Sequence, residues 1–178
     1  MPAPSTLILF AHPALEKSRA NRSLLKATAG LDHVTVNDLY QEYPDFQIDV
    51  PREQALAESH DRIVIQHPFY WYSTPAIVKE WFDVVLRYGW AYGQGGTALH
   101  GKQLCTVTTT GGGSDAYCNE GYNTYPVEEF LKPIEQTARL CGMSYAEPLI
   151  FYGALNQDES GCDAWATTYR NWLNTTSN

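Results

Sequence analysis

The chain has 178 residues, of which 44% are hydrophobic and 18% are charged, and this composition is typical of one globular domain spanning residues 1–178. The formal net charge of −8 argues against nucleic-acid binding, because a basic surface is needed to neutralise phosphates. No apolar stretch approaches the length of a membrane span, and the first residues lack the features of a signal peptide. We therefore expect a cytoplasmic protein, which can still attach to the inner membrane through a protein partner.

The cysteines indicate neither a metal site nor a disulfide framework. Cys105, Cys118, Cys141 and Cys162 are widely spaced, whereas structural zinc sites normally pair cysteines a few residues apart. We expect four reduced, structural thiols and no bound metal.

Short apolar runs alternate with longer amphipathic runs along the chain, which predicts alternating strands and helices. The predicted strands cover, in chain order, residues 6–11, 34–36, 62–66, 103–109 and about 144–151. The predicted helices cover residues 21–29, 52–59, 75–89, 127–141 and 164–173. Thr74 is expected to cap the third helix and Gly89 to end it, while Pro133 is expected to kink the fourth helix or separate its first turn.

This alternation predicts an α/β fold whose parallel strands are joined by right-handed crossovers, with helices on both faces of the sheet. Five strands suit the order 2-1-3-4-5. Ligands of such a sheet bind beyond the carboxyl ends of the strands, at the switch point between strands 1 and 3. Binding residues are therefore expected in the loops after strands 1, 3 and 4.

The loop after strand 1 contains polar groups suited to an anion. They are His12, Ser18, Arg19, Ala20 and Asn21. Hydroxyl, amide and free backbone N–H groups at a helix N-terminus bind anions, and His12 and Arg19 are expected to add positive charge. The loop has neither a dinucleotide-binding glycine motif nor a P-loop. The alternative is that Ser18 only caps the helix and His12 only bonds locally.

The loop after strand 3 contains four consecutive aromatic residues between prolines, namely Phe69, Tyr70, Trp71 and Tyr72. We expect them to form a wall for a flat ring, because aromatic faces and edges stack on such rings. The alternative is that they pack into the core or into a subunit interface.

The loop after strand 4 contains Thr109, Thr110, Gly111 and Gly112. Its glycines let the backbone approach a ligand closely, so that N–H groups can meet ring carbonyl oxygens. A second glycine-rich segment, residues 90–102, is read either as a connection or as part of the site or of a dimer interface.

These motifs resemble the flavodoxin-like NAD(P)H:quinone oxidoreductases, in particular the branch of KefF, the ancillary protein of a glutathione-regulated potassium-efflux system. The resemblance covers most of the chain. The matching residues are Ala11-His12-Pro13, Leu39-Tyr40, Tyr43 to Phe46, Gln66-His67-Pro68, Trp71-Tyr72-Ser73, Pro75, Lys79, Trp81, Asp83, Gly89 to Gly93, Gly95 to Leu99 and Thr109 to Gly112.

The resemblance implies a flavodoxin-like three-layer sandwich that binds a flavin, FMN in the nearest branch and FAD in larger relatives. His12 and residues 18–21 would hold the phosphate side, and residues 69–72 and 109–112 would hold the ring. It also implies a homodimer with its site at the subunit boundary. Larger relatives place a tyrosine and a histidine near the flavin; here the positions fall on Tyr117 and Asn123. The asparagine at the histidine position matters because an asparagine donates a hydrogen bond but takes up no proton at neutral pH.

We therefore expect an enzyme that transfers a hydride from NAD(P)H through a bound flavin to a quinone, by a ping-pong mechanism. Two alternatives remain. One is a regulatory subunit of a membrane potassium-efflux protein, and the other is a flavodoxin-type one-electron carrier.

Overall fold

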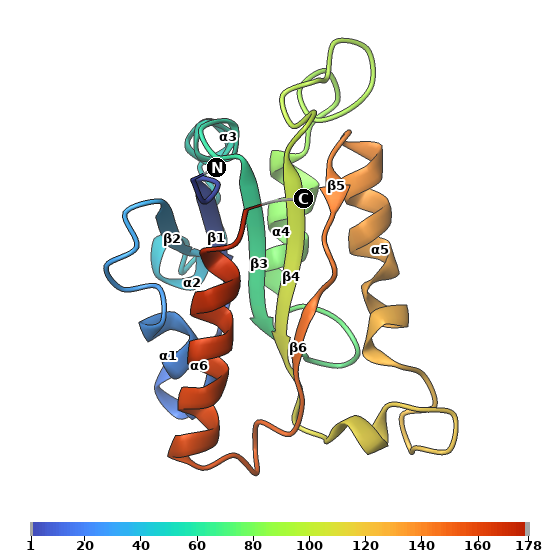
Figure 1. Ribbon diagram of the computed structural model, residues 1–178. Helices are drawn as coiled ribbons and strands as arrows, with labels where there is room; N and C mark the ends of the chain where they lie inside the picture. Colours follow the sequence, from blue (N-terminus) through green and yellow to red (C-terminus); the bar gives the residue numbers. More distant parts are fainter. Residues whose placement is uncertain (1, 177–178) are drawn as a thin grey trace.

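The computed structural model describes residues 2–176, and its centre is a parallel sheet covered by helices on both faces (Figure 1). The strands run in the order β2-β1-β3-β4-β5, with β6 also paired to β4, and this order confirms the expected topology. Their bounds are β1 Thr6–Phe10, β2 Val34–Asp38, β3 Arg62–Pro68, β4 Gln103–Thr109, β5 Ser144–Tyr145 and β6 Leu149–Phe151.

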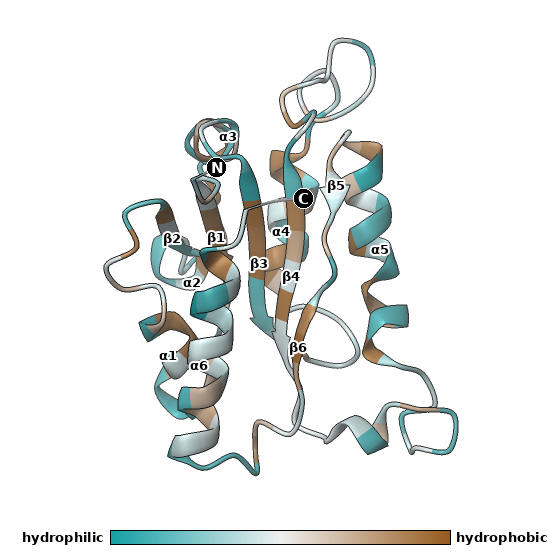
Figure 2. Ribbon diagram, in the orientation of Figure 1, coloured by the Kyte–Doolittle hydropathy of each residue, from teal (hydrophilic) through white to brown (hydrophobic). Residues whose placement is uncertain are grey.

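The central strands are buried along their whole length. Every residue of β1 and of β3 is buried, as expected for strands covered on both faces. The middle of β3 is hydrophobic, whereas its two ends are hydrophilic (Figure 2). The register places Phe10 beside Gln66, and Gln66 beside Val107. The carboxyl ends of β1, β3 and β4 therefore meet at one edge of the sheet.

The single fifth strand expected near residues 144–151 is divided in two. Both β5 and β6 pair with β4, but residues 146–148 between them belong to neither strand. Pro148 lies in this gap and has no N–H to donate to a ladder, which explains the interruption.

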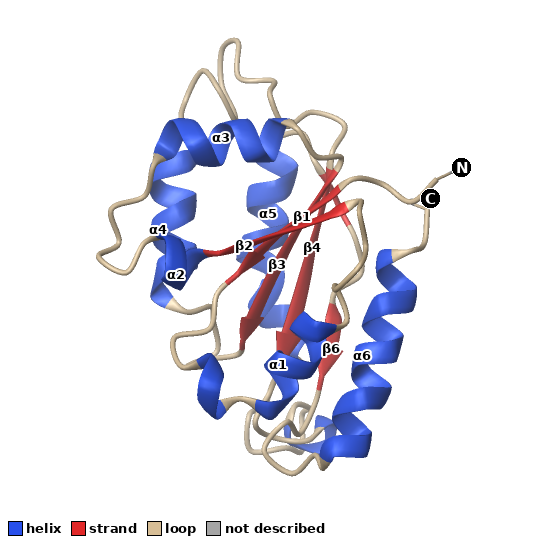
Figure 3. Ribbon diagram, turned by 90° about the vertical axis from the view of Figure 1, so that its left-hand side faces the viewer, coloured by secondary structure: helices blue, strands red, loops and turns tan. Residues whose placement is uncertain are grey.

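Within residues 2–176, six α-helices form the two outer layers of the fold, which Figure 3 shows on either side of the sheet. One layer packs α1 (Arg19–Lys26) and α6 (Glu159–Leu173) on Ile8, Phe10 and Val64. The opposite layer contains α2 (Leu39–Glu42), α3 (Val50–Glu58), α4 (Ala76–Val85) and α5 (Val127–Leu140). Two short 3-10 helices, Leu15–Lys17 and Ser114–Ala116, lie in loops. Among residues 2–176, no helix is both long and apolar enough to cross a membrane.

Several helix boundaries differ from the expected ones. The N-cap of α4 is Pro75 without a side-chain bond, so the expectation that Thr74 caps this helix is wrong. The same helix ends at Val85, before Gly89. Pro133 lies within the uninterrupted helix α5, so there is no separate first turn. The last helix begins early, since Asp158 accepts a hydrogen bond from the N–H of Gly161.

The glycine-rich segment 90–102 lies between α4 and β4, at the amino end of β4 (Figure 1). Its base is fixed to the end of α3, because Trp90 Nε1 donates to Glu58 Oε1 (2.6 Å) and Lys102 Nζ donates to Glu58 O (2.7 Å). Within one chain it is therefore far from the carboxyl edge of the sheet.

Candidate functional site

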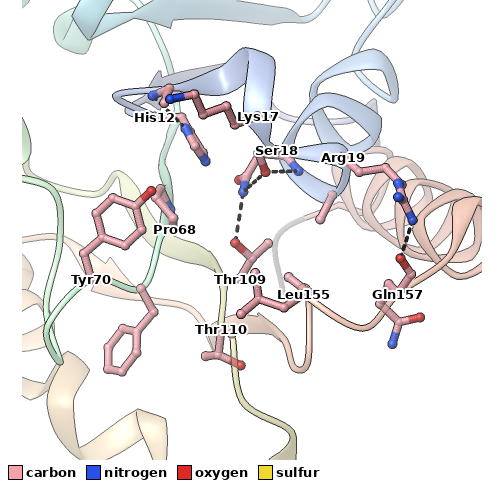
Figure 4. A pocket seen from close by; sticks show the side chains of 16 residues that line it. His12, Lys17, Ser18, Arg19, Pro68, Tyr70, Thr109, Thr110, Leu155 and Gln157 are labelled. Carbon is pink, nitrogen blue, oxygen red and sulfur yellow. Dashed lines mark hydrogen bonds between the residues drawn. The ribbon is translucent and has the colours of Figure 1, made fainter.

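A cavity of about 420 Å³ opens at the carboxyl ends of the strands, and we call it the main cavity (Figure 4). Four segments line it: the loops after β1, β3, β4 and β6. The lining residues are His12, Ala14, Lys17, Ser18, Arg19, Ala20, Asn21, Pro68, Phe69, Tyr70, Thr109, Thr110, Gly111, Ala154, Leu155 and Gln157.

One end of the main cavity is built from the N-terminus of α1. Ser18 caps the helix, since its Oγ accepts from the N–H of Asn21 at 3.2 Å. The N–H groups of Arg19 and Ala20 donate to no group within residues 2–176, as is usual in a first helical turn. Lys17 adds a positive charge to the lining. Two free donors, a hydroxyl and a cation at the positive end of a helix dipole make a site for a phosphate.

Arg19 and Asn21 connect this end to distant parts of the chain. Arg19 Nη1 donates to the carbonyl oxygen of Gln157 at 2.7 Å, and both residues line the cavity. Asn21 Nδ2 donates to Ser18 Oγ (3.1 Å) and Thr109 Oγ1 (3.0 Å), which ties the loop after β1 to the loop after β4. The Oδ1 atom of Asn21 is buried without a partner among the described residues.

His12 contributes a neutral ring, so the positive charge expected of it is wrong. Its side chain is 7% exposed, and burial lowers its pKa. Nδ1 accepts from the N–H of Ala14 at 3.1 Å, which leaves Nε2 to carry the proton.

Another part of the main cavity is lined by apolar side chains. Phe69 and Tyr70 line it with Leu155, and the N–H of Phe69 donates to the carbonyl oxygen of Thr109 at 2.8 Å. Gly111 lies so close to the loop after β6 that a Cβ atom there would be 3.2 Å from Leu155. These side chains offer apolar and aromatic surface to a ring.

A second cavity of about 240 Å³ adjoins the first, and we call it the aromatic cavity. Phe69 lines both cavities. The other lining residues of the aromatic cavity are Trp71, Tyr72, Tyr117, Tyr122 and Asn123. Trp71 is 93% exposed at the rim, so it does not pack into the core of this chain.

The sequence-predicted site residues are thus divided between the two cavities. Most of them line the main cavity, whereas Trp71, Tyr72, Tyr117 and Asn123 line the aromatic cavity. Gly112 lines neither cavity; a Cβ atom there would lie 2.9 Å from the hydroxyl of Tyr122.

Sequence reasoning missed several lining residues. The loop after β6 supplies Ala154, Leu155 and Gln157 to the main cavity. The others are Ala14, Lys17 and Pro68 in the main cavity and Tyr122 in the aromatic cavity. The signal for the loop after β6 was its position, since it also follows the carboxyl end of a strand beside β4. The predicted strand ended at Phe151, and the loop beyond it has no glycine cluster or aromatic run to mark it.

Cys105, Cys141 and Cys162 are buried, and all four cysteines are free thiols. Burial raises the pKa of Cys105 to about 12. Within residues 2–176, no group of three or more His, Cys, Asp or Glu side chains could hold a metal ion.

Residues 4–173 match a protein family described as having a flavodoxin-like fold. This chain belongs to that flavodoxin-like family. The glutathione-regulated potassium-efflux system ancillary protein KefG of Serratia proteamaculans (strain 568) is 49% identical over 170 residues, which cover 96% of this chain and 93% of KefG.

Two solved structures share the fold of this family member. General stress protein 14 of Treponema denticola, solved in complex with FMN, has a TM-score of 0.90 and 38% identity, and the match covers 96% of this chain and 98% of that chain. An NADPH-quinone reductase from P. pentosaceus has a TM-score of 0.87 and 29% identity, and the match covers 98% and 99% of the two chains. The family relatives therefore include an FMN-bound protein and a quinone reductase.

The main cavity fits the two chemical halves of FMN. Its polar end offers the free N–H groups of Arg19 and Ala20 to a phosphate, and its apolar end offers Phe69 and Tyr70 to a ring. Asn21 lines the cavity, and its buried Oδ1, which has no partner among the described residues, would accept from a hydroxyl of the sugar alcohol chain.

Proposed function

We propose that the protein is a flavin-dependent NAD(P)H:quinone oxidoreductase whose cofactor is FMN. The observation that carries the proposal is the main cavity, which combines a helix N-terminus with free donors and an aromatic surface at the carboxyl ends of β1, β3 and β4. A bound flavin would supply two-electron hydride chemistry, which protein side chains alone do not provide. The similarity to an FMN complex and to a quinone reductase supports this assignment.

The residues of the main cavity have the following proposed roles. Ser18, Arg19, Ala20 and Asn21 bind the phosphate side together with the neutral ring of His12. Phe69, Tyr70, Thr109, Thr110 and Gly111 would hold the ring of a bound flavin and exclude water from it, and Gly112 belongs to the same loop.

The aromatic cavity receives the two substrates in turn, NAD(P)H first and the quinone after the nicotinamide has left, which is a ping-pong order. Trp71 and Tyr72 orient flat rings by stacking. Tyr117, whose pKa is raised by burial, keeps its proton at neutral pH and can donate a hydrogen bond to developing negative charge. Asn123 can donate but cannot accept a proton, so protons are taken up from solvent.

A purified preparation tests this proposal directly. We expect a yellow protein whose released cofactor has the mass of FMN rather than FAD. It should oxidise NADH or NADPH only when a quinone is added. A colourless protein that takes up no added FMN would contradict the proposal. Reduction in two separate one-electron stages would instead favour a flavodoxin-type carrier.

A second candidate function, an ancillary subunit, is favoured by the 49% identity to KefG, a protein named for a potassium-efflux system. We propose that this protein is cytoplasmic and binds a membrane potassium-efflux protein peripherally. The wild type and a flavin-free variant are compared for capture of the solubilised efflux protein. This comparison separates the ancillary role from the enzymatic role. Equal capture by both would show that binding does not depend on catalysis.

We also propose that the protein is a homodimer. A groove of about 280 Å³ between α4 and α5 is lined in part by Phe82, Phe130 and Ile134, which are apolar side chains for a second copy to cover. Sedimentation equilibrium should give the mass of two chains; the mass of one chain would contradict the proposal.

A further inference from the structure

The side chain of Arg19 points towards the loop after β6, although its backbone N–H belongs to the N-terminus of α1 (Figure 4). Its Nη1 donates to the carbonyl oxygen of Gln157 at 2.7 Å, a contact that we call the Arg19–Gln157 bridge. Hydrogen bonds from Gly161 and Ser160 lower the pKa of Asp158, and the charge of Arg19 lowers it further. The guanidinium therefore joins two segments of the chain beside the main cavity.

The loop that receives this bond is itself held in place. The N–H groups of Gly153 and Ala154 donate to the carbonyl oxygens of Gly112 and Thr110, both at 2.8 Å. These bonds fix the start of the loop after β6 to the loop after β4, and the guanidinium fixes its far end to α1. The acceptor in the bridge is a backbone oxygen, so the bridge does not depend on the side chain at position 157.

Figure 4 shows where the bridge lies relative to the two halves of the proposed cofactor. Tyr70 lies on one side of the main cavity, and Arg19 and Gln157 lie on the opposite side. Ser18 and Thr109 lie between them. A flavin with its ring at Tyr70 and its phosphate at the N-terminus of α1 therefore directs its phosphate end towards the bridge.

FMN and FAD differ at this end. FMN ends in a phosphate monoester, whereas in FAD the same phosphate is joined through a second phosphate to adenosine. A chain that continues past the phosphate has to displace the bridge. Opening it removes a hydrogen bond made by a charged donor, which lowers affinity by about tenfold.

We infer that the Arg19 side chain determines the cofactor specificity of the main cavity. Through its bond to Gln157 O it closes the cavity beyond the phosphate. The site then takes a flavin that ends in a phosphate monoester and excludes one whose phosphate continues into a second nucleotide. The inference rests on the proposed function in one respect: the ligand of the main cavity is a flavin.

The test measures the affinities of FMN and FAD by titration calorimetry, on the full chain after its bound flavin has been removed. We expect the wild type to bind FMN about tenfold more tightly than FAD. Arg19→Ala should bind FAD more tightly than the wild type does, so that the ratio falls to about one. It should still bind FMN, because the backbone N–H at position 19 remains for the phosphate.

Two further variants separate specificity from general damage to the site. Arg19→Lys retains a donor for Gln157 O and should keep a preference for FMN. Arg22→Ala is the matched control, because it removes an exposed cation from the same helix, outside the main cavity, and it should keep the wild-type ratio. A damaged site binds both flavins more weakly, whereas loss of the bridge raises the affinity for FAD.

Three results would overturn the inference: equal affinities for FMN and FAD in the wild type, an unchanged ratio in Arg19→Ala, or an equal loss of preference in Arg22→Ala. If Arg19→Ala does not fold, Arg19→Met takes its place, since it keeps an apolar stem and removes the donors.

Quinone-dependent oxidation of NAD(P)H, measured on the same preparations, separates the two proposals. A protein that prefers FMN through Arg19 but oxidises no NAD(P)H contradicts the proposed function alone. An active protein that binds FMN and FAD equally contradicts this inference alone, and a protein that binds neither flavin contradicts both.

Discussion

Ser18, the N-cap of α1, accepts two hydrogen bonds from Asn21. Its Oγ accepts from both the backbone N–H and the side-chain amide of Asn21, at 3.2 Å and 3.1 Å. These bonds set the helix start so that the N–H groups of Arg19 and Ala20 remain free. Ser18 therefore caps α1 and also shapes the proposed phosphate site.

Ser18→Ala should therefore weaken both the fold and cofactor binding. We expect a loss of about 1 kcal/mol in the free energy of unfolding, from urea denaturation, and a weaker FMN affinity, from flavin fluorescence. Asp49→Ala is the matched control, because Asp49 caps α3 through the N–H of Arg52 and does not line the cavity. The control should lose similar stability and keep its FMN affinity; equal loss of affinity in both variants would contradict the assignment.

His67 is a fully buried histidine next to the site. Burial lowers its pKa to about 4, and its Nδ1 lies 2.9 Å from the carbonyl oxygen of Pro68. Since a carbonyl oxygen only accepts, Nδ1 carries the proton and the ring is neutral. This bond fixes the carbonyl group of Pro68, the last residue of β3, directly before Phe69.

The low pKa of His67 predicts a loss of stability in acid. The unfolded chain binds a proton near pH 6.5, so stability is full above that pH and falls as the pH drops from 6.5 towards 4, by up to about 3 kcal/mol. In urea denaturation, His67→Phe should reduce this dependence, whereas the exposed control His100→Gln should keep it. An unchanged pH profile in His67→Phe would show that other groups cause the acid sensitivity.

At the scale of elements, Glu53 on α3 joins the helices of one layer to the edge of the sheet. Its carboxylate accepts from Asn37 Nδ2 (3.0 and 2.9 Å), Tyr43 Oη (2.6 Å) and Trp81 Nε1 (2.8 Å). These donors come from β2, from the residue after α2 and from α4. Burial and the Glu53 carboxylate together raise the pKa of Tyr43 to about 12.

Glu53→Ala should be strongly destabilising, because it leaves several buried donors without an acceptor. We expect a loss of about 3–5 kcal/mol in the free energy of unfolding. Glu58→Ala removes the acceptor of an exposed bond from Trp90 Nε1 and should cost less than about 1 kcal/mol. Similar costs for the two substitutions would show that the buried cluster is not a major support of this layer.

Element boundaries were predicted less well than elements. The strand 103–109 matches β4, since its apolar run has clear ends. Side-chain caps explain other helix ends that differ from the predicted ones. Asp158 extends α6 towards its N-terminus, and Asp38 starts the unexpected helix α2 by accepting from the N–H of Tyr40. Whether an Asp or Thr acts as a cap depends on backbone angles that tertiary packing sets, as the unused Thr74 illustrates.

At the scale of the whole molecule, the main cavity exists because four loops from separate parts of the chain meet at one edge of the sheet (Figures 1 and 4). Contacts such as Asn21 Nδ2 to Thr109 Oγ1 and Arg19 Nη1 to Gln157 O join them. A ligand that spans the cavity should therefore stabilise the whole fold.

FMN should raise the melting temperature more than riboflavin, which has the same ring but no phosphate. FMN at 100 times its dissociation constant contributes about 2.7 kcal/mol of stability, which corresponds to a rise of about 5–11 °C in the melting temperature of a chain of this size. Riboflavin at the same concentration should give a smaller shift, because the N-terminus of α1 then binds no anion. Equal shifts measured by scanning calorimetry would contradict the phosphate site.

The sequence by itself determined the strand order, the family and three of the loops that form the site, because apolar periodicity and local motifs depend on residues that are neighbours in the chain. Only the tertiary structure decided how these residues are shared between two cavities, that the loop after β6 completes the first, and that His12 is neutral. The reason is physical: burial and the pairing of a polar atom are set by groups distant in sequence, such as Thr109 for Asn21 and Tyr72 for Asn123.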